Sequence, residues 1–231
     1  SKEIIERQLE QLDGVLLTGG DTLYEIYKDH ERMDPEFYRL DKTARNDYLR
    51  QVKTILDRAK AINDSGRVFN IYAICLGLQA MVLIESNGDI PIAFVNRNNI
   101  FDGVHMHDSH GAARHEYNDE DVALLSSANF MLYYHNLGFT VEDFKAQPAL
   151  ESQYVIEATY KAEKFGDCVG MMRHKRYPFT AVQFHPEKVL HEESPYFKKT
   201  EHPHARRIVY KMASILNKEH VRMRNGEFVW N

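Results

Sequence analysis

The sequence predicts an α/β fold in which helices flank a mostly parallel central sheet, and three observations support this. An apolar run over 15–17 leads into a glycine turn over 18–21, as a buried strand would. A helical pattern from Asp34 to Ile62, with apolar residues three and four apart, is followed by a β-rich run over 68–74. A second helical pattern comes directly after that run, over 77–87. Helix, buried strand, turn and helix in this order indicate parallel strands joined by helices.

The composition suits a chain that buries a core. Its 231 residues are 43% hydrophobic and 27% charged, so we expect a single domain over 1–231. The net charge of −5 argues against a broad nucleic-acid-binding surface. No run reaches the roughly 18 apolar residues of a membrane span. The two cysteines are too few for a disulfide framework, and no signal peptide is visible at the start of the given chain.

The remaining elements follow from the same periodicities. We expect helices over 2–12 and 203–219, the second followed by a polar tail, and strands over 90–95, 154–160, 167–172 and 179–184. The segment 96–120 is predicted as a polar, histidine-rich loop. The apolar stretch 122–134 is expected to include a strand that ends in a turn over 135–138. A basic turn over 173–178 is expected to be a solvated hairpin tip.

Cys75 stands between the strand over 68–74 and the helix that follows it. This strand–turn–helix pattern is that of a nucleophile elbow, which holds a side chain at the carboxyl end of a strand. The thiolate is the reactive form of cysteine, and the N-terminus of a helix favours it. We therefore predict that Cys75 is a nucleophile, with a buried structural thiol as the alternative.

A thiol nucleophile needs a base, and the chain has 12 histidines. Sequence spacing does not choose among them, because such partners meet only in the fold. His185 is the best candidate for this base on local grounds. It follows a predicted strand directly, Pro186 stiffens the loop, and Glu187 is near enough to orient the ring. Gly19 and Gly20 could bring a backbone N–H close to a developing anion, or they could form an ordinary loop.

His105 and His107 have a spacing that suits metal ligands on a strand. No cysteine or obvious carboxylate completes a set of ligands with them. We therefore favour a solvated loop or a substrate rim here over a zinc site, and we predict no metal.

Two motifs carry a family resemblance. The segments 75–79 (Cys-Leu-Gly-Leu-Gln) and 182–188 (Val-Gln-Phe-His-Pro-Glu-Lys) resemble the class I glutamine amidotransferase-like superfamily, whose fold is flavodoxin-like. The segment 14–20, the pair Tyr177-Pro178 and the surroundings of His135 resemble one branch, the γ-glutamyl hydrolases, or folate polyglutamate hydrolases. The likeness runs from about residue 12 to about residue 216.

The resemblance implies a thiol hydrolase that works through an acyl-enzyme. Cys75 would attack a γ-glutamyl carbonyl, His185 would act as base and then as acid, and Glu187 would orient His185. The backbone N–H groups of Gly20 and Leu76 would form the oxyanion hole.

The resemblance also implies a substrate, a small-molecule poly-γ-glutamyl compound, and no cofactor. His135 would contact the scissile glutamyl unit, with Gly19 beside it. The substrate's carboxylates need cations to bind them. The candidates are Arg97, Arg114, Arg173, Lys175 and Arg176.

The chain departs from the branch at several positions. Ala73 stands where the branch usually has Gly, two residues before the nucleophile, and Ala tolerates a strained backbone less well. Thr18 stands where the branch has Pro, and Tyr134 where it usually has Asn. The first βα unit of the family has no counterpart before Lys2, which would leave an inner edge of the sheet exposed. We therefore expect that either the chain is a fragment of a longer protein or another chain covers the gap.

Three functions are open at this point. The first is hydrolysis of γ-glutamyl bonds. The second is a catalytically inactive scaffold subunit of a larger assembly, and the third is a glutaminase domain that feeds ammonia to a synthetase. A homodimer is also compatible with the sequence. The resemblance implies a lysosomal, vacuolar or secreted location.

Overall fold

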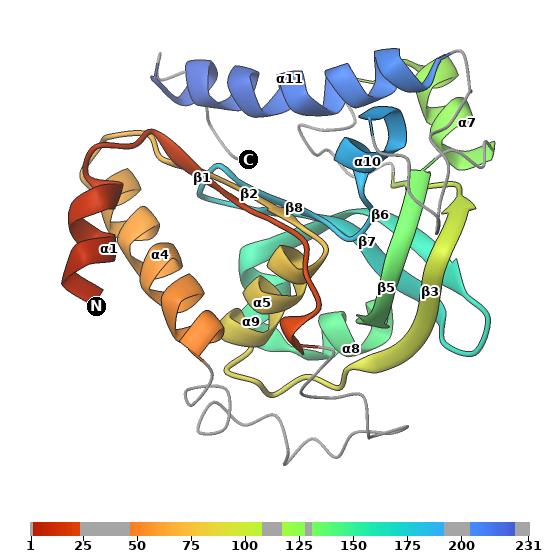
Figure 1. The fold of residues 1–231 in the computed structure, drawn as a ribbon, viewed down its shortest axis with the longest axis horizontal. Helices are drawn as coiled ribbons and strands as arrows, with labels where there is room; N and C mark the ends of the chain where they lie inside the picture. The colour runs from red at the N-terminus through yellow and green to blue at the C-terminus, as the bar shows by residue number, and fades with distance from the viewer. Residues whose placement is uncertain (1, 24–46, 108–116, 128–130, 192–203, 225–231) are drawn as a thin grey trace.

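The computed structural model describes residues 2–23, 47–107, 117–127, 131–191 and 204–224. The predicted α/β fold is confirmed, since helices cover both faces of a central sheet (Figure 1). The helices are α1 (Lys2–Leu9), α4 (Asp47–Asp64), α5 (Leu76–Glu85), α7 (Asp119–Ser127), α8 (Val141–Ala146), α9 (Pro148–Gln153), α10 (Pro186–His191) and α11 (Ala205–Arg224). The strands are β1 (Gly14–Leu17), β2 (Asn70–Ile74), β3 (Ala93–Asp102), β4 (His105–Met106), β5 (Met131–Gly138), β6 (Tyr154–Ala162), β7 (Gly166–His174) and β8 (Phe179–Val182).

The main sheet is mixed, with the strand order β1-β2-β8-β7-β6-β4. β1, β2 and β8 pair in parallel, whereas the pairs β8–β7, β7–β6 and β6–β4 are antiparallel. The expectation of a mostly parallel sheet therefore holds only for the first three strands. The short connections over 163–165 and 175–178 explain the antiparallel pairs β6–β7 and β7–β8, because so few residues can join only antiparallel neighbours.

A second, two-stranded sheet lies where a loop was expected. β3 and β5 pair in antiparallel fashion, so the predictions of a loop throughout 96–120 and of a turn over 135–138 are wrong. The strand pattern was hidden because the register of β3 shifts twice, and Asn96 and Asn99 in it have positive φ angles. Such bulges break the period-two alternation from which a strand is recognised. The first part of the apolar stretch 122–134 belongs to α7, and the strand begins only at Met131.

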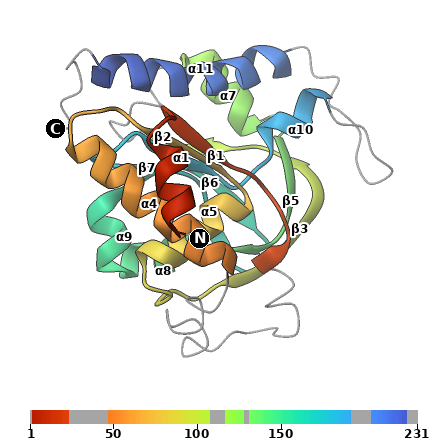
Figure 2. The ribbon, with the colours of Figure 1, turned by 60° about the vertical axis from the view of Figure 1, so that its left-hand side comes forward.

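The two faces of the parallel strands bury separate apolar cores. Ile71 and Ala73 of β2 join the core beneath α4 and α5, whereas Ile74 joins the core beneath α11. Figure 2 shows α4 and α5 on the opposite side of the sheet from α11. With both faces covered, these strands can be almost wholly apolar, as their sequences are.

The end segments agree in part with the predictions. α1 ends at Leu9, earlier than expected, and α11 continues to Arg224, beyond the predicted end. The predicted helix start at Asp34 lies outside the described residues. Within the described ranges, no helix combines the length and the apolar character needed to cross a bilayer. β1 is the outermost strand of the described sheet.

Candidate active site

Cys75 occupies the turn between β2 and α5. Its φ and ψ angles are 52° and −101°, a conformation that L-residues rarely adopt and that is typical of strained functional turns. The helix begins immediately, at Leu76, and packs close to β1. A Cβ on Gly77 would lie 2.6 Å from the carbonyl oxygen of Leu17, so only glycine fits at that position. The backbone thus forms the elbow that the sequence predicts.

The backbone strain in this elbow lies at Cys75 rather than at Ala73. Ala73 is an ordinary residue of β2, fully buried and in register with Leu17 and Ala181. Four non-glycine residues of the described chain have positive φ angles, and Ala73 is not one of them. Alanine therefore fits the elbow without a conformational penalty.

His185 is brought to Cys75 by the sheet itself. Cys75 follows β2 and His185 follows soon after β8, and these two strands are parallel neighbours with Ile74 in register with Val182. Because the carboxyl ends of parallel strands lie at the same edge, both side chains project there. The Cys75 N–H donates to the Val182 carbonyl at 2.7 Å, and the His185 N–H donates to the Leu132 carbonyl at 2.8 Å. These bonds hold both residues through the backbone.

Glu187 lies in the first turn of α10 and contacts the imidazole. Nδ1 of His185 donates a hydrogen bond of 2.7 Å to Oε1 of Glu187. This bond fixes the tautomer and leaves Nε2, which is buried, for a proton from the thiol. Burial lowers the pKa of His185, but the influence of the neighbouring Cys75 and Glu187 outweighs burial and raises the pKa to about 9.

The glycine turn after β1 packs against this pair. A Cβ on Gly19 would lie 2.7 Å from Cε1 of His185 and 3.6 Å from Cβ of Cys75. A Cβ on Gly20 would instead meet the end of the Leu76 side chain, at 2.9 Å. The backbone of Gly19 thus lies against both reacting residues, and Gly20 and Leu76, the predicted oxyanion donors, are neighbours.

His135 lies in the middle of β5 and is 5% exposed. Its Nδ1 is 2.9 Å from the carbonyl oxygen of Leu137, which accepts the ring proton, so Nε2 carries a free lone pair. Nε2 is buried and has no hydrogen-bond partner among the described residues. Burial is the main reason that the pKa of His135 falls to about 3, so the ring is neutral at physiological pH.

A cavity of about 790 Å³ joins these residues. Six of the predicted site residues line it, namely Gly19, Gly20, Cys75, His135, His185 and Glu187. Thr18 and Tyr134, two positions at which the chain departs from the branch, line the cavity as well. The carbonyl of Tyr134 lies 3.9 Å from Sγ of Cys75. The cavity is large enough for a ligand of the size of a dipeptide or more.

Comparison with known proteins places this arrangement in a family. Residues 50–202 match the glutamine amidotransferase class-I family. The chain belongs to that family.

Several curated relatives of this class I amidotransferase chain are γ-glutamyl hydrolases, which confirms the resemblance to that branch. γ-Glutamyl hydrolase 1 of Arabidopsis thaliana is 30% identical over 81% of this chain and 49% of its own length. A probable γ-glutamyl hydrolase 3 of the same plant is 28% identical, over 81% of this chain and 48% of its own. The γ-glutamyl hydrolase of Rattus norvegicus is 23% identical, over 81% and 53%. The chain thus spans about half the length of the curated relatives it matches.

The basic residues expected to bind substrate lie elsewhere in this amidotransferase fold. None of Arg97, Arg173, Lys175 and Arg176 lines the cavity, and Arg114 lies outside the described residues. Arg173 was expected on a solvated hairpin tip, which is wrong, since it is 3% exposed and pairs with the buried Glu157. Its position in β7 follows from the strand continuing to His174.

The other three basic residues have partners of their own. Arg97 pairs with Asp102 and lies over the rings of Tyr133 and Tyr160. Lys175 donates to the carbonyl of Glu151, and Arg176 pairs with Asp64. The pair of Arg97 and Asp102 lies within β3, whereas the partners of Lys175 and Arg176 come from other elements, so the sequence could not reveal those two contacts.

Five polar residues that were not predicted as site residues also line the cavity. They are Asp21, Gln79, Asn98, Asn136 and Lys188. Gln79 is buried and donates to the carbonyl of Leu137, so it steadies the strand that carries His135. Lys188 is the one lysine or arginine among the described residues that line this cavity. The position of Lys188 directly after Glu187 could have indicated its role. No such signal marked Asn98, because the continuation of β3 beyond residue 95 was not recognised.

His105 and His107 belong to β4 and its extension rather than to a free loop. Nε2 of His107 lies 3.2 Å from Oγ1 of Thr159, and no cluster of three or more ligand-type side chains occurs in the part of the chain that the structure describes. His110 and His115 lie outside that part.

Proposed function

We propose that this chain carries the catalytic site of a cysteine hydrolase that cleaves γ-glutamyl amide bonds. The observation that carries the proposal is the convergence of Cys75 and His185 at the ends of neighbouring parallel strands, with Glu187 bonded to the far side of the imidazole. A nucleophile, a nearby base and a third group that orients the base are the parts that such catalysis requires.

The reaction would proceed through a thioester. His185 Nε2 takes the thiol proton, and the Cys75 thiolate attacks the γ-carbonyl carbon of the substrate. The tetrahedral oxyanion accepts hydrogen bonds from the backbone N–H groups of Gly20 and Leu76. The amide bond then breaks, and the imidazolium protonates the leaving amine. Water, deprotonated by His185, attacks the thioester and releases the glutamyl acid and the free thiol.

Two further residues suit a glutamyl substrate. Lys188 offers a positive charge to a substrate carboxylate in a cavity whose other charged lining residues are the acids Asp21 and Glu187. The neutral His135 offers its free Nε2 as an acceptor for a substrate N–H. Folate poly-γ-glutamates present both kinds of group along their chain.

Substitution of Cys75 and His185 tests the proposal on γ-glutamyl substrates. Cys75→Ala and His185→Ala should each lower cleavage of a γ-glutamyl anilide and of a pteroyl triglutamate by at least about a thousandfold. Gln183→Ala is a poor control because it would disturb packing. Glu142→Gln is a better control, since it changes an exposed side chain on α8 and leaves the site intact. Retained turnover in Cys75→Ala would exclude a thiol mechanism.

Alkylation separates the hydrolase from an inactive scaffold. Iodoacetamide should label Cys75 within minutes at neutral pH, and a glutamate analogue should slow the labelling. Slow labelling that is insensitive to the analogue, together with no turnover, would assign the chain to the scaffold class. Ammonia release from free glutamine, faster than cleavage of γ-glutamyl peptides, would favour a glutaminase instead.

A further inference from the structure

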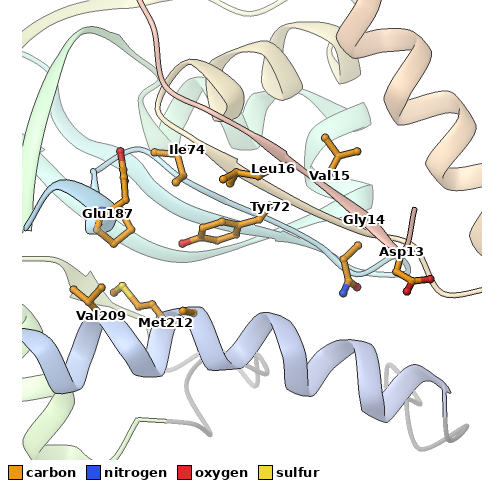
Figure 3. Close-up of a pocket in the computed structure, with 12 residues that line it drawn as sticks. Asp13, Gly14, Val15, Leu16, Tyr72, Ile74, Glu187, Val209 and Met212 are labelled. Carbon is orange, nitrogen blue, oxygen red and sulfur yellow. The ribbon is translucent and has the colours of Figure 1, made fainter. Parts of the chain in front are cut away.

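Glu187 lines two cavities, and the walls of these cavities differ. The cavity of about 610 Å³ between the sheet and α11 has apolar side chains such as Leu16 and Met212 in its walls (Figure 3). The active-site cavity has instead, in the wall that β3 and β5 supply, the carboxamides of Asn98 and Asn136. The proposed bond cleavage does not use these two side chains, so they are available to bind another part of a substrate.

The irregular register of β3 turns Asn98 toward the active-site cavity. In the first part of the ribbon, Ala93 pairs with Gly138. If that register continued, Asn98 would lie opposite Tyr133, whose side chain is fully buried. A bulge in β3 shifts the pairing by one residue, so that Asn98 lies opposite Tyr134 instead. Because a shift of one residue exchanges the two faces of a strand, the bulge brings Asn98 to the face that lines the cavity.

This arrangement is held by backbone conformations that few residues adopt. Asn96, in the first bulge of β3, has a φ of 48°, and Asn99, in the second, has a φ of 56°. Asparagine tolerates this left-handed region better than β-branched or bulky residues do. Bulges next to active sites commonly re-aim a side chain, and strain of this kind is typical of functional sites. The strain in β3 therefore has an identifiable effect, which is the placement of Asn98.

The two carboxamides are bonded to each other and leave one donor and one acceptor. Nδ2 of Asn98 donates to Oδ1 of Asn136 and, at 3.3 Å, to Oδ1 of Asn96. Among the described residues, Oδ1 of Asn98 and Nδ2 of Asn136 have no hydrogen-bond partner. Asn98 is exposed and Asn136 is half-buried, so a ligand in the cavity can reach both. If the carboxamides bond in the reverse sense, one oxygen and one nitrogen still remain.

A neighbouring acceptor and donor complement an amide group. The N–H of such a group donates to Oδ1 of Asn98, and its carbonyl oxygen accepts from Nδ2 of Asn136. A carboxylate has only acceptors, so it would leave Oδ1 of Asn98 without a donor, and the neutral pair has no charge to attract it. The pair therefore suits a neutral amide better than the carboxylate of a free amino acid.

The ribbon lies on the side of the site from which the leaving group departs. His185, which would protonate the leaving amine, is tethered to β5, since its N–H donates to the Leu132 carbonyl. The proposed oxyanion donors Gly20 and Leu76 belong instead to the turn after β1 and to α5. A substrate whose carbonyl oxygen points to these donors thus directs its leaving amine toward β5.

The dimensions agree with this placement. The carbonyl of Tyr134, the residue opposite Asn98, lies 3.9 Å from Sγ of Cys75. Opposed residues of antiparallel strands have Cα atoms about 4.5–5.5 Å apart. In a leaving peptide, the nitrogen of the next amide lies three bonds from the scissile nitrogen, at about 3–4 Å. The next amide therefore falls within reach of a side chain opposite Tyr134.

We propose that Asn98 and Asn136 bind the amide group that follows the first residue of the leaving group. The site then prefers substrates whose leaving group is itself a peptide over γ-glutamyl amino acids and glutamine, whose leaving groups lack that amide. In a turnover assay this inference rests on the proposed hydrolase function, whereas in a binding assay it does not.

Matched substrates provide the first test. γ-Glutamylalanine N-methylamide carries the second amide, and the corresponding methyl ester lacks only its N–H. The unmodified chain should cleave the amide with a kcat/KM at least about tenfold above that of the ester, as expected for the loss of one hydrogen bond. γ-Glutamylalanine with its free carboxylate should also be cleaved at least about tenfold less efficiently than the amide. Equal cleavage of all three compounds, or a preference for the free carboxylate, would overturn the proposal.

Substitution of Asn98 shows whether this residue reads the amide. Asn98→Ala should bring the ratio of the kcat/KM values for amide and ester close to one and leave the value for the ester almost unchanged. A merely structural role would lower both values and keep the ratio. Because the ratio is compared between chains, the different basicities of the two leaving amines cancel. Gln51→Ala, which removes an exposed carboxamide of α4 that does not line the cavity, is the matched control. An unchanged ratio in Asn98→Ala would overturn the proposal.

Two substitutions at Asn96 test whether the bulge aims Asn98. Asn96→Asp keeps a residue that tolerates positive φ and also keeps the oxygen that accepts from Asn98, so the amide preference should persist. Asn96→Val places a β-branched side chain where φ is 48°, so the bulge should be lost and the amide preference with it. A folded Asn96→Val variant that keeps the full preference would refute the role of the bulge. If that variant does not fold, the Asn98→Ala comparison decides.

Binding to the Cys75→Ala chain separates this inference from the proposed function. Isothermal titration should show the amide bound at least about tenfold more tightly than the ester, and addition of Asn98→Ala should remove the difference. If the unmodified chain cleaves neither compound but the amide preference appears in binding, the hydrolase proposal fails and this inference stands. Cleavage without an amide preference has the opposite meaning. Neither cleavage nor measurable binding of the two compounds would overturn both.

Discussion

The backbone N–H of Cys75 donates a 2.7 Å hydrogen bond to the carbonyl of Val182. This bond joins the end of the strand that carries the candidate nucleophile to the strand that leads to the candidate base. The distance between the two reacting side chains is thus set by sheet register, which is stiff, rather than by flexible loops. The glycine turn after β1 completes the arrangement, and the first prediction concerns that turn.

Gly19→Ala should lower kcat/KM for a γ-glutamyl substrate by about a hundredfold, since small displacements of reacting groups have effects of that size. The new Cβ would lie 2.7 Å from Cε1 of His185, so the imidazole or the turn must move. Gly20→Ala is the matched control, because its Cβ would meet only the flexible end of Leu76. We expect a loss of less than about tenfold there. Equal activity of Gly19→Ala and the unmodified chain would contradict the close packing of this turn on the site.

Glu187→Gln should lower both the pKa of His185 and the rate of acylation. The bond from His185 to Glu187 is one of the interactions that raise the pKa of the imidazole to about 9, and a neutral amide stabilises the imidazolium less. Titration of the His185 ring by NMR should show a lower pKa in the variant. Glu142→Gln should leave the titration unchanged. A His185 pKa that does not move would mean that Glu187 does not orient the ring in solution.

The raised pKa of His185 also predicts how stability depends on pH. The folded-state pKa of about 9 lies above the ordinary value of 6.5, so the folded state binds this proton more tightly than the unfolded state. The resulting stabilisation is complete below pH 6.5 and is lost as the pH rises through 9. The upper limit of this stabilisation is about 3 kcal/mol, which follows from the size of the pKa shift of His185. Urea unfolding at pH 6 and at pH 9.5 should show that His185→Gln loses less stability over this interval than the unmodified chain. An identical loss in both proteins would refute the coupling.

The sequence predicted the parts of the fold whose patterns are local and strong. The strands β2 and β8 are short runs rich in apolar residues, and the elbow and the residues around His185 have distinctive local patterns, so Cys75 and His185 could be paired from the sequence. The predicted strand over 90–95 includes only the start of β3, because the bulges at Asn96 and Asn99 destroy the alternation that marks a strand. His135 was selected by resemblance, but its place in the middle of β5 follows from pairing with β3 and could not be predicted without it.

The contacts of the predicted basic residues could not be foreseen, for a different reason. A cation in the sequence has no indicated partner, and the partners here are distant, such as Glu157 for Arg173 and Asp64 for Arg176. Only the three-dimensional arrangement distinguishes a cation that lines the cavity from one that lies elsewhere on the fold. Lys188 was not predicted to bind substrate, because the roles of the neighbouring His185 and Glu187 already explained the motif that contains it.

Lys188→Gln should raise KM for a γ-glutamyl substrate with a free carboxylate by about tenfold, the usual effect of removing one charge-assisted contact. kcat should change little, because the contact holds the substrate equally in the ground and transition states. Lys175→Gln and Arg176→Gln are matched controls, since they remove the same charge from side chains that do not line the cavity. A substrate whose carboxylate is converted to an amide should lose the difference between Lys188→Gln and the unmodified chain. If the three variants change KM alike, the effect comes from net charge rather than from Lys188, and carboxylate binding by this residue is excluded.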